Sequence, residues 1–329
     1  MDAPIKLEHD IGGKVAEIQW IKKGTQMILS VSRRTDIPAF FHEWFLNRID
    51  EGFVLVRNTM NSSQIGKVTL SLDIVDCIVF WSKNPAAMLA SLGRLSDYHY
   101  YFQFTITPYG KNIEPNLPDK AKIIDTFRRL ADRLGPHRVV WRYDPIFIGT
   151  SHSVSYHVES FGKMANSLLG YTEKSIISFI EPYRKIKHNM ADGKMRVVDT
   201  EAKHEIAEQL AKTACENSLA LETCAQDIDL SRYGIARAKC IDGDLVERII
   251  GCPLDVEKDK SGRPNCECAT SIDIGAYNTC PHGCIYCYAN YQHSSVLENL
   301  KNHDGSSALL IGAGTEIGTC TERAAKSNR

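Results

Sequence analysis

The chain has 329 residues, enough for one large core or two smaller ones, and its 39 Lys plus Arg nearly balance its 40 Asp plus Glu. This balance excludes a global basic field of the kind that holds nucleic acid or an anionic membrane. The segment 1–20 has no apolar targeting core, and no apolar run approaches membrane-spanning length. We therefore expect a cytoplasmic protein without membrane attachment and without a strong affinity for nucleic acid.

Short apolar runs alternate with amphipathic stretches along most of the chain. The apolar runs are residues 27–31, 53–57, 76–81, 101–107, 138–143, 175–180, 219–223 and 271–277. The helical stretches include residues 39–51, 119–135, 153–170 and 200–218. This alternation is typical of βα units around a parallel sheet. Eight such units predict an α/β fold with a (β/α) barrel of the TIM-like type.

Two segments interrupt the alternation. Residues 58–74 are too few for a crossover helix, and residues 224–270 form a long insertion before the eighth predicted strand. We therefore expect three regions. Residues 1–223 supply barrel units, residues 224–270 form a cysteine-rich insertion, and residues 271–329 contain the βα unit that completes the barrel, followed by a tail.

Three cysteines in the last region have the spacing C-x3-C-x2-C, namely Cys280, Cys284 and Cys287. Thiolates at these spacings can point inward around one cluster. A structural zinc site requires four protein ligands, and the nearby His282 stands between two of the cysteines, where it would strain the usual zinc geometry. The pattern thus favours a [4Fe-4S] cluster with one iron lacking a protein ligand over a zinc knuckle. Tyr286, directly before the third cysteine, suits a ring stacked beside a bound adenosine.

The insertion contributes a second group of cysteines. Its members are Cys224, Cys240, Cys266 and Cys268. Four thiolates are what a closed cluster needs, so the pattern favours a second [4Fe-4S] cluster, with a structural zinc ion and unligated thiols as the alternatives. Cys252 is a reserve ligand, although its apolar neighbours favour a buried thiol. Cys77 in a strand and Cys215 in a helix are predicted core residues.

The residues around the first motif resemble a known superfamily. "SIDIGAY" runs into "NTCPHGCIYCYAN" and then into a helical stretch, which is similar to the strand, loop and helix that begin the barrel of radical S-adenosylmethionine proteins. The wider pattern, including "SRRTDIPAF", "FWSKNP", "WRYDPI" and "SALLIG", is similar to a bacterial family known only as a domain of unknown function. Because the motif stands late in the chain, the resemblance implies a circularly permuted barrel. Strand 271–277 would then close it, in parallel with strands 27–31 and 219–223.

The resemblance also implies a function. The cluster, reduced by a donor such as flavodoxin or ferredoxin, would cleave S-adenosylmethionine to a 5'-deoxyadenosyl radical that abstracts hydrogen from an unknown small-molecule or peptide substrate. The superfamily's Gly-Gly-Glu-like segment, which receives the cofactor's ammonium group, is missing after strand 27–31, and Asp36 is the predicted substitute. Arg33, Arg34 or Arg142 are candidates for the cofactor carboxylate. Arginines at strand ends also suggest an anionic substrate.

Two alternatives belong to other functional classes. One is a DNA-repair lyase of the spore photoproduct type, whose C-x-Y-C-Y stretch resembles residues 284–288, although a duplex binder should carry clustered Lys and Arg. The other is a non-catalytic iron-sulfur or zinc module for redox transfer or binding. Such a module would not require arginines at the strand ends.

Overall fold

The structure is a computed structural model of the chain and describes residues 27–61, 63–184, 186–191, 194–260, 263, 265–312 and 320–322. Residues 1–26 of the first predicted region, and most of the predicted tail after residue 312, lie outside the described residues. Within this described part, no helix combines the length and apolar composition needed to cross a bilayer.

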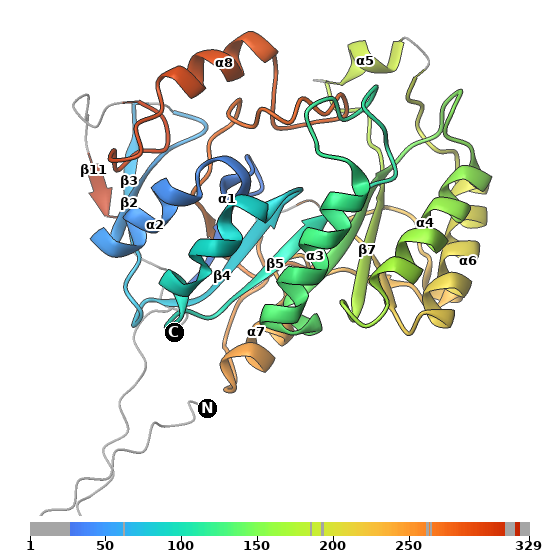
Figure 1. Cartoon of the computed structure of the whole chain (residues 1–329), viewed down its shortest axis with the longest axis horizontal. Coiled ribbons are helices and arrows are strands. Elements are labelled where there is room, and N and C mark those ends of the chain that lie inside the picture. Colours follow the sequence, from blue (N-terminus) through green and yellow to red (C-terminus); the bar gives the residue numbers. More distant parts are fainter. Residues whose placement is uncertain are drawn as a thin grey trace, which may run out of the picture.

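An eight-stranded sheet in which all neighbours run parallel forms the centre of the molecule (Figure 1). Its spatial order is β10-β1-β4-β5-β6-β7-β8-β9. The strands are β1 (Met27–Val31), β4 (Val75–Ser82), β5 (Tyr100–Thr105), β6 (Val139–Ile146), β7 (Lys174–Phe179), β8 (Ala220–Thr223), β9 (Ala236–Arg237) and β10 (Ser271–Asp273). Because they are parallel, their carboxyl ends share one edge, the upper one in Figure 1.

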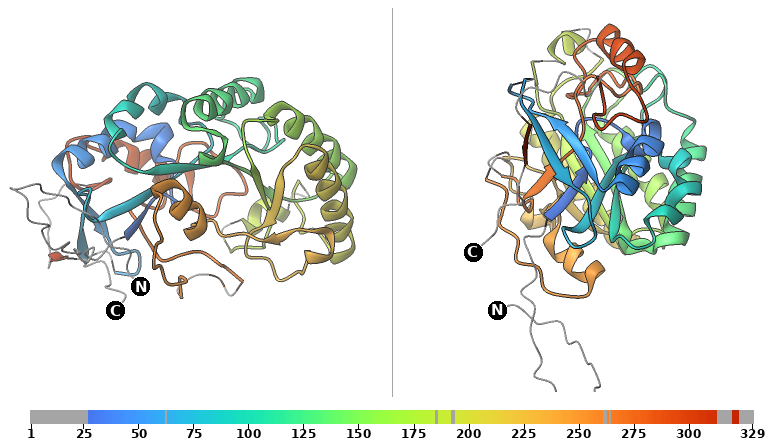
Figure 2. Two further views of the ribbon diagram at one scale, coloured as in Figure 1. Left: turned by 90° about the horizontal axis from the view of Figure 1, so that it is seen from below. Right: turned by 90° about the vertical axis from the view of Figure 1, so that its left-hand side faces the viewer.

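Helices cover the outer face of this sheet (Figures 1 and 2). They are α1 (Ile37–Phe40), α2 (His42–Glu51), the 3-10 helix η1 (Pro85–Leu95), α3 (Lys120–Leu134), α4 (Val154–Leu168) and α6 (Thr200–Glu216). Their apolar residues pack on every second strand residue, such as Leu29, Phe80, Phe102 and Trp141, in the largest core. The predicted helices are therefore present, with the first one divided at Phe41.

Most of the described residues of the segment 224–270 lie across the opposite, inner face of the sheet, where Figure 2 shows them in gold to orange. This segment contains the short η3 (Ser231–Tyr233), β9 and α7 (Gly243–Ile250). Ile241 and Val246 pack against the alternate strand residues, among them Val79 and Tyr101, in a second core. The predicted insertion thus fills the inside of the curved sheet.

The remaining elements are peripheral. A three-stranded sheet has the order β11-β3-β2, with β2 (Phe53–Arg57), β3 (Ile65–Thr69) and β11 (Cys320–Glu322). The short η2 (Pro136–Arg138) precedes β6, α5 (Lys187–Ala191) follows β7, and α8 (His293–Lys301) lies above the carboxyl edge (Figure 1).

Two expectations about the barrel need correction. Run 53–57 was predicted as a barrel strand, but β2 pairs antiparallel with β3 outside the central sheet, because so short a connection permits a hairpin and no parallel crossover. The predicted pairing of strand 271–277 with strand 27–31 is confirmed for Ser271–Asp273. Its predicted second pairing, with strand 219–223, is wrong, since β8 lies between β7 and β9. The described residues form no ladder between β9 and β10, and the sheet they make is open.

Candidate metal centre

The C-x3-C-x2-C motif lies in the loop between β10 and α8, at the carboxyl edge of the sheet (Figure 1). The loop contains no regular helix or strand in its described residues 274–292, so its backbone groups need partners elsewhere. Side-chain amides supply several of them. Asn116 donates to the carbonyl of Pro281 at 2.8 Å, Asn189 to that of Ile285 at 2.6 Å, and Asn290 to that of Cys280 at 2.7 Å. These bonds hold the thiol-bearing loop in one shape.

A buried carboxylate, Asp36, ties this loop to the neighbouring strands. One oxygen accepts from the Ser82 hydroxyl at 2.7 Å and from the Ala39 amide at 3.0 Å. The second of these bonds caps the amino terminus of α1. The other oxygen accepts from the Lys83 amide and faces His282 Nε2, both at 2.8 Å. The predicted site residue Asp36 therefore stands beside the motif, with both of its oxygens already engaged by the protein. His282, once a candidate ligand, points its Nε2 at this carboxylate.

A second buried carboxylate, Glu114, anchors the other end of the loop. It accepts the Tyr286 hydroxyl and the ammonium groups of Lys83 and Lys120, the Lys83 bond measuring 2.8 Å. Thr107 donates to the same carboxylate at 2.7 Å. Burial would raise the pKa of Glu114, but the two lysines outweigh it and lower the pKa to about 2. The carboxylate is therefore ionised and holds Tyr286 in place.

The Tyr286 ring is buried in the molecule. Tyr109 lies 5.8 Å and Phe147 6.2 Å from it, measured between ring centroids, and the Lys83 ammonium lies 5.3 Å from its centroid. Tyr286 thus packs beneath the motif, and its stacking on an adenosine stays a prediction.

The three thiols of the motif lie close enough to influence one another's ionisation. Burial raises the pKa of Cys284 to about 12, opposed by the nearby Lys83. Burial also raises the pKa of Cys280, with further contributions from Asp36 and from Cys287 and Cys284. Three thiols without a histidine directed at them are one ligand short of a structural zinc site and equal in number to the protein ligands of an iron-sulfur cluster with one open iron. A bound cluster would have to displace the thiol protons.

Arg33 and Arg34, both predicted to bind the cofactor, contact Asp273, the last residue of β10. The Asp273 carboxylate accepts a hydrogen bond from the backbone amide of Arg33 at 2.8 Å. It also lies 3.7 Å from Nε of Arg33 and 3.9 Å from Nε of Arg34. Ser32 donates to the same carboxylate at 2.6 Å. Gly275 is required here, because a Cβ at this position would lie 1.9 Å from the Ser32 hydroxyl oxygen. Asp36, Arg33 and Arg34 therefore share one edge with the cysteine loop.

Arg142 lies on the inner face of the sheet. Its Nη1 donates to Cys240 Sγ at 3.1 Å and to Gln103 at 3.3 Å, and its Nη2 forms a 2.6 Å ion pair with Asp144. Burial opposes the charge of Arg142, but Asp144 and the nearby thiols raise its pKa well above the usual value. The structure thus places Arg142 beside the second cysteine group.

The structure brings the four cysteines of this second group near one another, and their role as metal ligands stays a prediction. Cys224 Sγ lies 3.1 Å from Cys240 Sγ, and the thiol of Cys268 interacts with those of Cys240 and Cys266. Cys252 is separate and lines a small cavity with Val75 and Ile250 at the amino edge of the sheet. Cys215, predicted as a core residue, is exposed because it lies on the outer side of α6. In the described part of the chain, no three His, Cys, Asp or Glu side chains are arranged around one point as ligands of a single bound ion.

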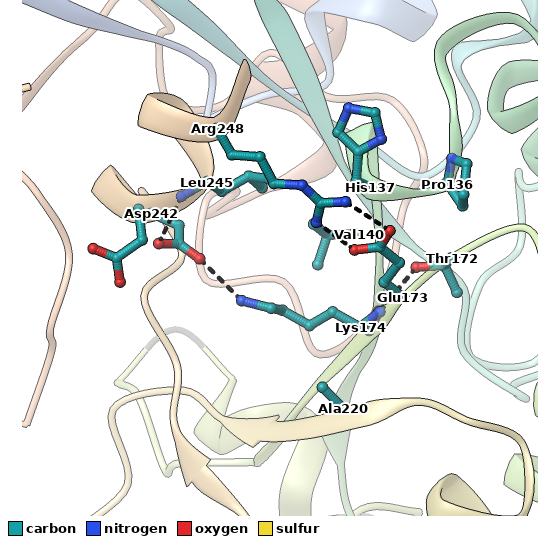
Figure 3. A pocket seen from close by; sticks show the side chains of 11 residues that line it. Pro136, His137, Val140, Thr172, Glu173, Lys174, Ala220, Asp242, Leu245 and Arg248 are labelled. Carbon is teal, nitrogen blue, oxygen red and sulfur yellow. Dashed lines mark hydrogen bonds and ion pairs between the residues drawn. The ribbon is translucent and has the colours of Figure 1, made fainter. Parts of the chain in front are cut away.

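A larger cavity of ≈ 320 Å³ lies at the amino edge, below α7 (Figure 3). Four of its charged side chains pair with one another. Arg248 forms a 2.6 Å ion pair with Glu173, and Lys174 forms a 2.9 Å pair with Asp242. Since active sites of parallel α/β folds lie at the carboxyl ends of the strands, this cavity is on the wrong edge for the cysteine loop.

The family model described as a domain of unknown function, DUF1848, matches residues 28–289. The chain belongs to the DUF1848 family. The match includes nearly all of the central sheet and all three cysteines of the motif, together with both carboxylates that anchor their loop. No curated protein matches the chain.

Sequence reasoning missed several residues of this DUF1848 site. Glu114 lies in a loop whose sequence has no helical or strand periodicity. Nothing in the sequence therefore indicates that Glu114 is buried between two lysines. Asp273 had a signal, because it is an acidic residue inside an apolar strand run. Arg263 was missed as well, although it donates to Cys224 Sγ at 3.6 Å.

Proposed function

We propose that this chain is a radical S-adenosylmethionine enzyme, with a [4Fe-4S] cluster held by Cys280, Cys284 and Cys287. The observation that carries the proposal is the three-thiol loop itself, fixed at the carboxyl edge of a parallel sheet, where His282 is engaged by Asp36. Three thiolates leave one iron open for the cofactor. When bound and reduced by a flavodoxin or ferredoxin, the cluster would supply the electron that cleaves S-adenosylmethionine to a 5'-deoxyadenosyl radical.

The protein's own groups have three tasks in this proposal. The asparagine amides and the Asp36–His282 pair keep the loop backbone in place. The three thiol side chains would rotate toward one point on cluster binding. Glu114 and Lys83 hold the Tyr286 ring beneath the motif. His282 and Tyr286 are buried beside the motif and limit the access of solvent to it.

Charged groups for the methionyl end of the cofactor lie at the same edge. Because both Asp36 oxygens are occupied, reception of the cofactor ammonium by Asp36 would require a donor such as Ser82 to give way. The ion pairs of Arg33 and Arg34 with Asp273 are long, at 3.7 and 3.9 Å. Their further hydrogen bonds, to the Ser271 hydroxyl and the Gly275 carbonyl, are long as well, at 3.4 and 3.3 Å. Their guanidinium groups are therefore the better candidates for the cofactor carboxylate.

The proposal is tested by anaerobic reconstitution with iron and sulfide, followed by reduction with dithionite and assay of 5'-deoxyadenosine from S-adenosylmethionine. We expect slow formation by the wild type without substrate and none by Cys284→Ala, because that change removes a cluster ligand. Cys215→Ala is the matched control, since this thiol is exposed and away from the site. It should retain wild-type activity.

Two results would oppose the proposal. Formation of 5'-deoxyadenosine by Cys284→Ala at the wild-type rate would show that the loop is not the electron donor. Absence of cleavage in a wild type whose iron, sulfide and absorption prove an intact cluster would favour the non-catalytic redox module.

A further inference from the structure

Four cysteines from three separate segments, none of them part of the first motif, lie near one another on the inner face of the sheet. Cys224 directly follows β8, Cys240 follows β9, and Cys266 and Cys268 lie in the stretch before β10. Cys224, Cys240 and Cys268 are buried and Cys266 is half-buried. Two of the sulfur atoms, those of Cys224 and Cys240, are only 3.1 Å apart. Unrelated buried thiols need not gather in this way, since each would pack equally well among apolar side chains.

Guanidinium groups face these sulfur atoms, which is a second and independent observation. Arg142 Nη1 donates to Cys240 Sγ at 3.1 Å, and Arg263 Nη2 donates to Cys224 Sγ at 3.6 Å. Arg142 is itself buried, and removing its charge from water is costly unless negative charge stands nearby. Asp144 supplies one such charge, and thiolates at Cys240 and Cys224 would supply more.

We propose that Cys224, Cys240, Cys266 and Cys268 form a second metal centre, in which four thiolates bind a thiophilic metal, either a zinc ion or an iron-sulfur cluster. Both take four thiolates with no other protein donor, so the ligand chemistry is shared. Arg142 and Arg263 are positioning residues that offset the negative charge of the ligands. This proposal uses none of the residues of the first motif and does not rest on the proposed enzymatic function.

The sulfur contacts run from Cys224 to Cys240, from Cys240 to Cys268 and from Cys268 to Cys266. They form a chain and do not surround one point, so binding includes side-chain rotation that closes the chain. The backbone amide of Ile241 donates to Cys268 Sγ at 3.5 Å and already directs one of the inner sulfur atoms. Amide donors of this kind are common neighbours of metal-bound thiolates.

A metal here would stabilise the insertion. The described residues of 224–270 contain little regular structure beyond η3, α7 and a two-residue strand, and their apolar core is small compared with that of the outer face. Ligands from the end of β8, from the turn after β9 and from the stretch before β10 would link the insertion at three places. The centre would thus fasten the insertion to the sheet as well as bind metal.

The test uses the full chain with Cys280, Cys284 and Cys287 all changed to Ala, so that its result is independent of the first site. Metal and acid-labile sulfide are measured after anaerobic purification. We expect either about one zinc, or about four irons with matching sulfide and a charge-transfer absorption, per chain. Adding Cys224→Ala and Cys240→Ala should remove this metal. Adding Cys215→Ala and Cys252→Ala, two thiols outside the group, should leave it.

The role of the Arg142 guanidinium group is tested separately, by the retention of metal against a chelator. In the same background, Arg142→Gln should weaken metal retention against a chelator by about 10–100-fold, as loss of a group that supports the ligands does elsewhere. Arg128→Gln is the control, because Arg128 donates to the Ser167 carbonyl on the outer face. Equal retention in the two variants would overturn the assigned role of Arg142.

Two outcomes would overturn the metal centre as a whole. One is a first-site variant that is folded by circular dichroism and contains no zinc or iron after purification and reconstitution. The other is a Cys224–Cys240 disulfide, detected by mass spectrometry under non-reducing conditions in the anaerobically purified protein. Because the metal content is measured before any change in the second group, misfolding of its variants cannot obscure the first of these results.

Discussion

The buried carboxylate of Glu114 offers a direct test of how the cysteine loop is anchored. Glu114→Gln removes the charge while it keeps the shape of the side chain. Burial raises the pKa of this carboxyl and the adjacent Lys83 and Lys120 lower it, with a net fall from 4.5 to about 2. A difference of this size corresponds to about 3 kcal/mol in the free energy of unfolding at neutral pH.

The pH dependence has a defined sign. Since the folded-state pKa lies below the unfolded-state value, the ionised carboxylate contributes its full stabilisation above about pH 4.5, and this contribution disappears as the pH falls toward 2. At about pH 4 roughly 0.8 kcal/mol of it is gone, and at about pH 3 roughly 2 kcal/mol. The difference between wild type and Glu114→Gln should therefore be largest at neutral pH and decrease in acid.

Urea unfolding followed by tryptophan fluorescence at pH 7 and pH 4 measures both quantities. Glu159→Gln serves as the control, because Glu159 forms an exposed ion pair with Lys163 on α4 and should contribute nothing measurable. The reasoning is refuted if Glu114→Gln loses no more stability than Glu159→Gln at pH 7. It is equally refuted if the loss is unchanged at pH 4.

Further predictions concern the carboxyl edge and a buried histidine. Gly275→Ala should cost about 3 kcal/mol in urea unfolding, because the new Cβ would lie 1.9 Å from the Ser32 hydroxyl oxygen and break its bond to the carboxylate of β10. Gly305→Ala, with open space around the new Cβ, should be nearly neutral. Burial lowers the pKa of His157 from 6.5 to about 4, so the fold should lose about 3 kcal/mol as the pH falls from 6.5 through 4. An NMR titration midpoint near 6.5 for this ring would contradict that expectation.

The strands that sequence reasoning located best are those buried on both faces. The run 76–81 became β4, whose residues are nearly all buried, and a continuous apolar run of this kind is what a central parallel strand requires. The run 53–57 looks the same in the sequence, yet it belongs to a hairpin outside the central sheet. Periodicity identifies a strand but not its partner. The short stretch before Ile65 was the signal for a hairpin.

The candidate site was predictable to a similar extent. Cysteine spacing located the loop, and the position of Asp36 after the first strand placed it at the same edge. The partners of Asp36 could not be deduced, because Ser82 and His282 are 46 and 246 residues away in the chain. Glu114 and its partner Tyr286 are likewise far apart in the chain, separated by 172 residues. Such contacts depend on which strands become neighbours, and a single sequence carries no direct record of that.

The late position of the cysteine motif follows from one pairing and does not require a closed barrel. Once Ser271–Asp273 adds parallel to β1, its carboxyl end meets the same edge as that of β1, and the loop that follows must lie beside Asp36. A closed barrel would require β10 to pair with β8 as well. That edge of β8 is instead occupied by β9, residues Ala236–Arg237. The insertion instead turns across the inner face, where strand alternation has already placed Arg142 between the outward-facing residues 141 and 143. The same alternation that predicts the outer core therefore also explains why a guanidinium group faces Cys240 from the sheet.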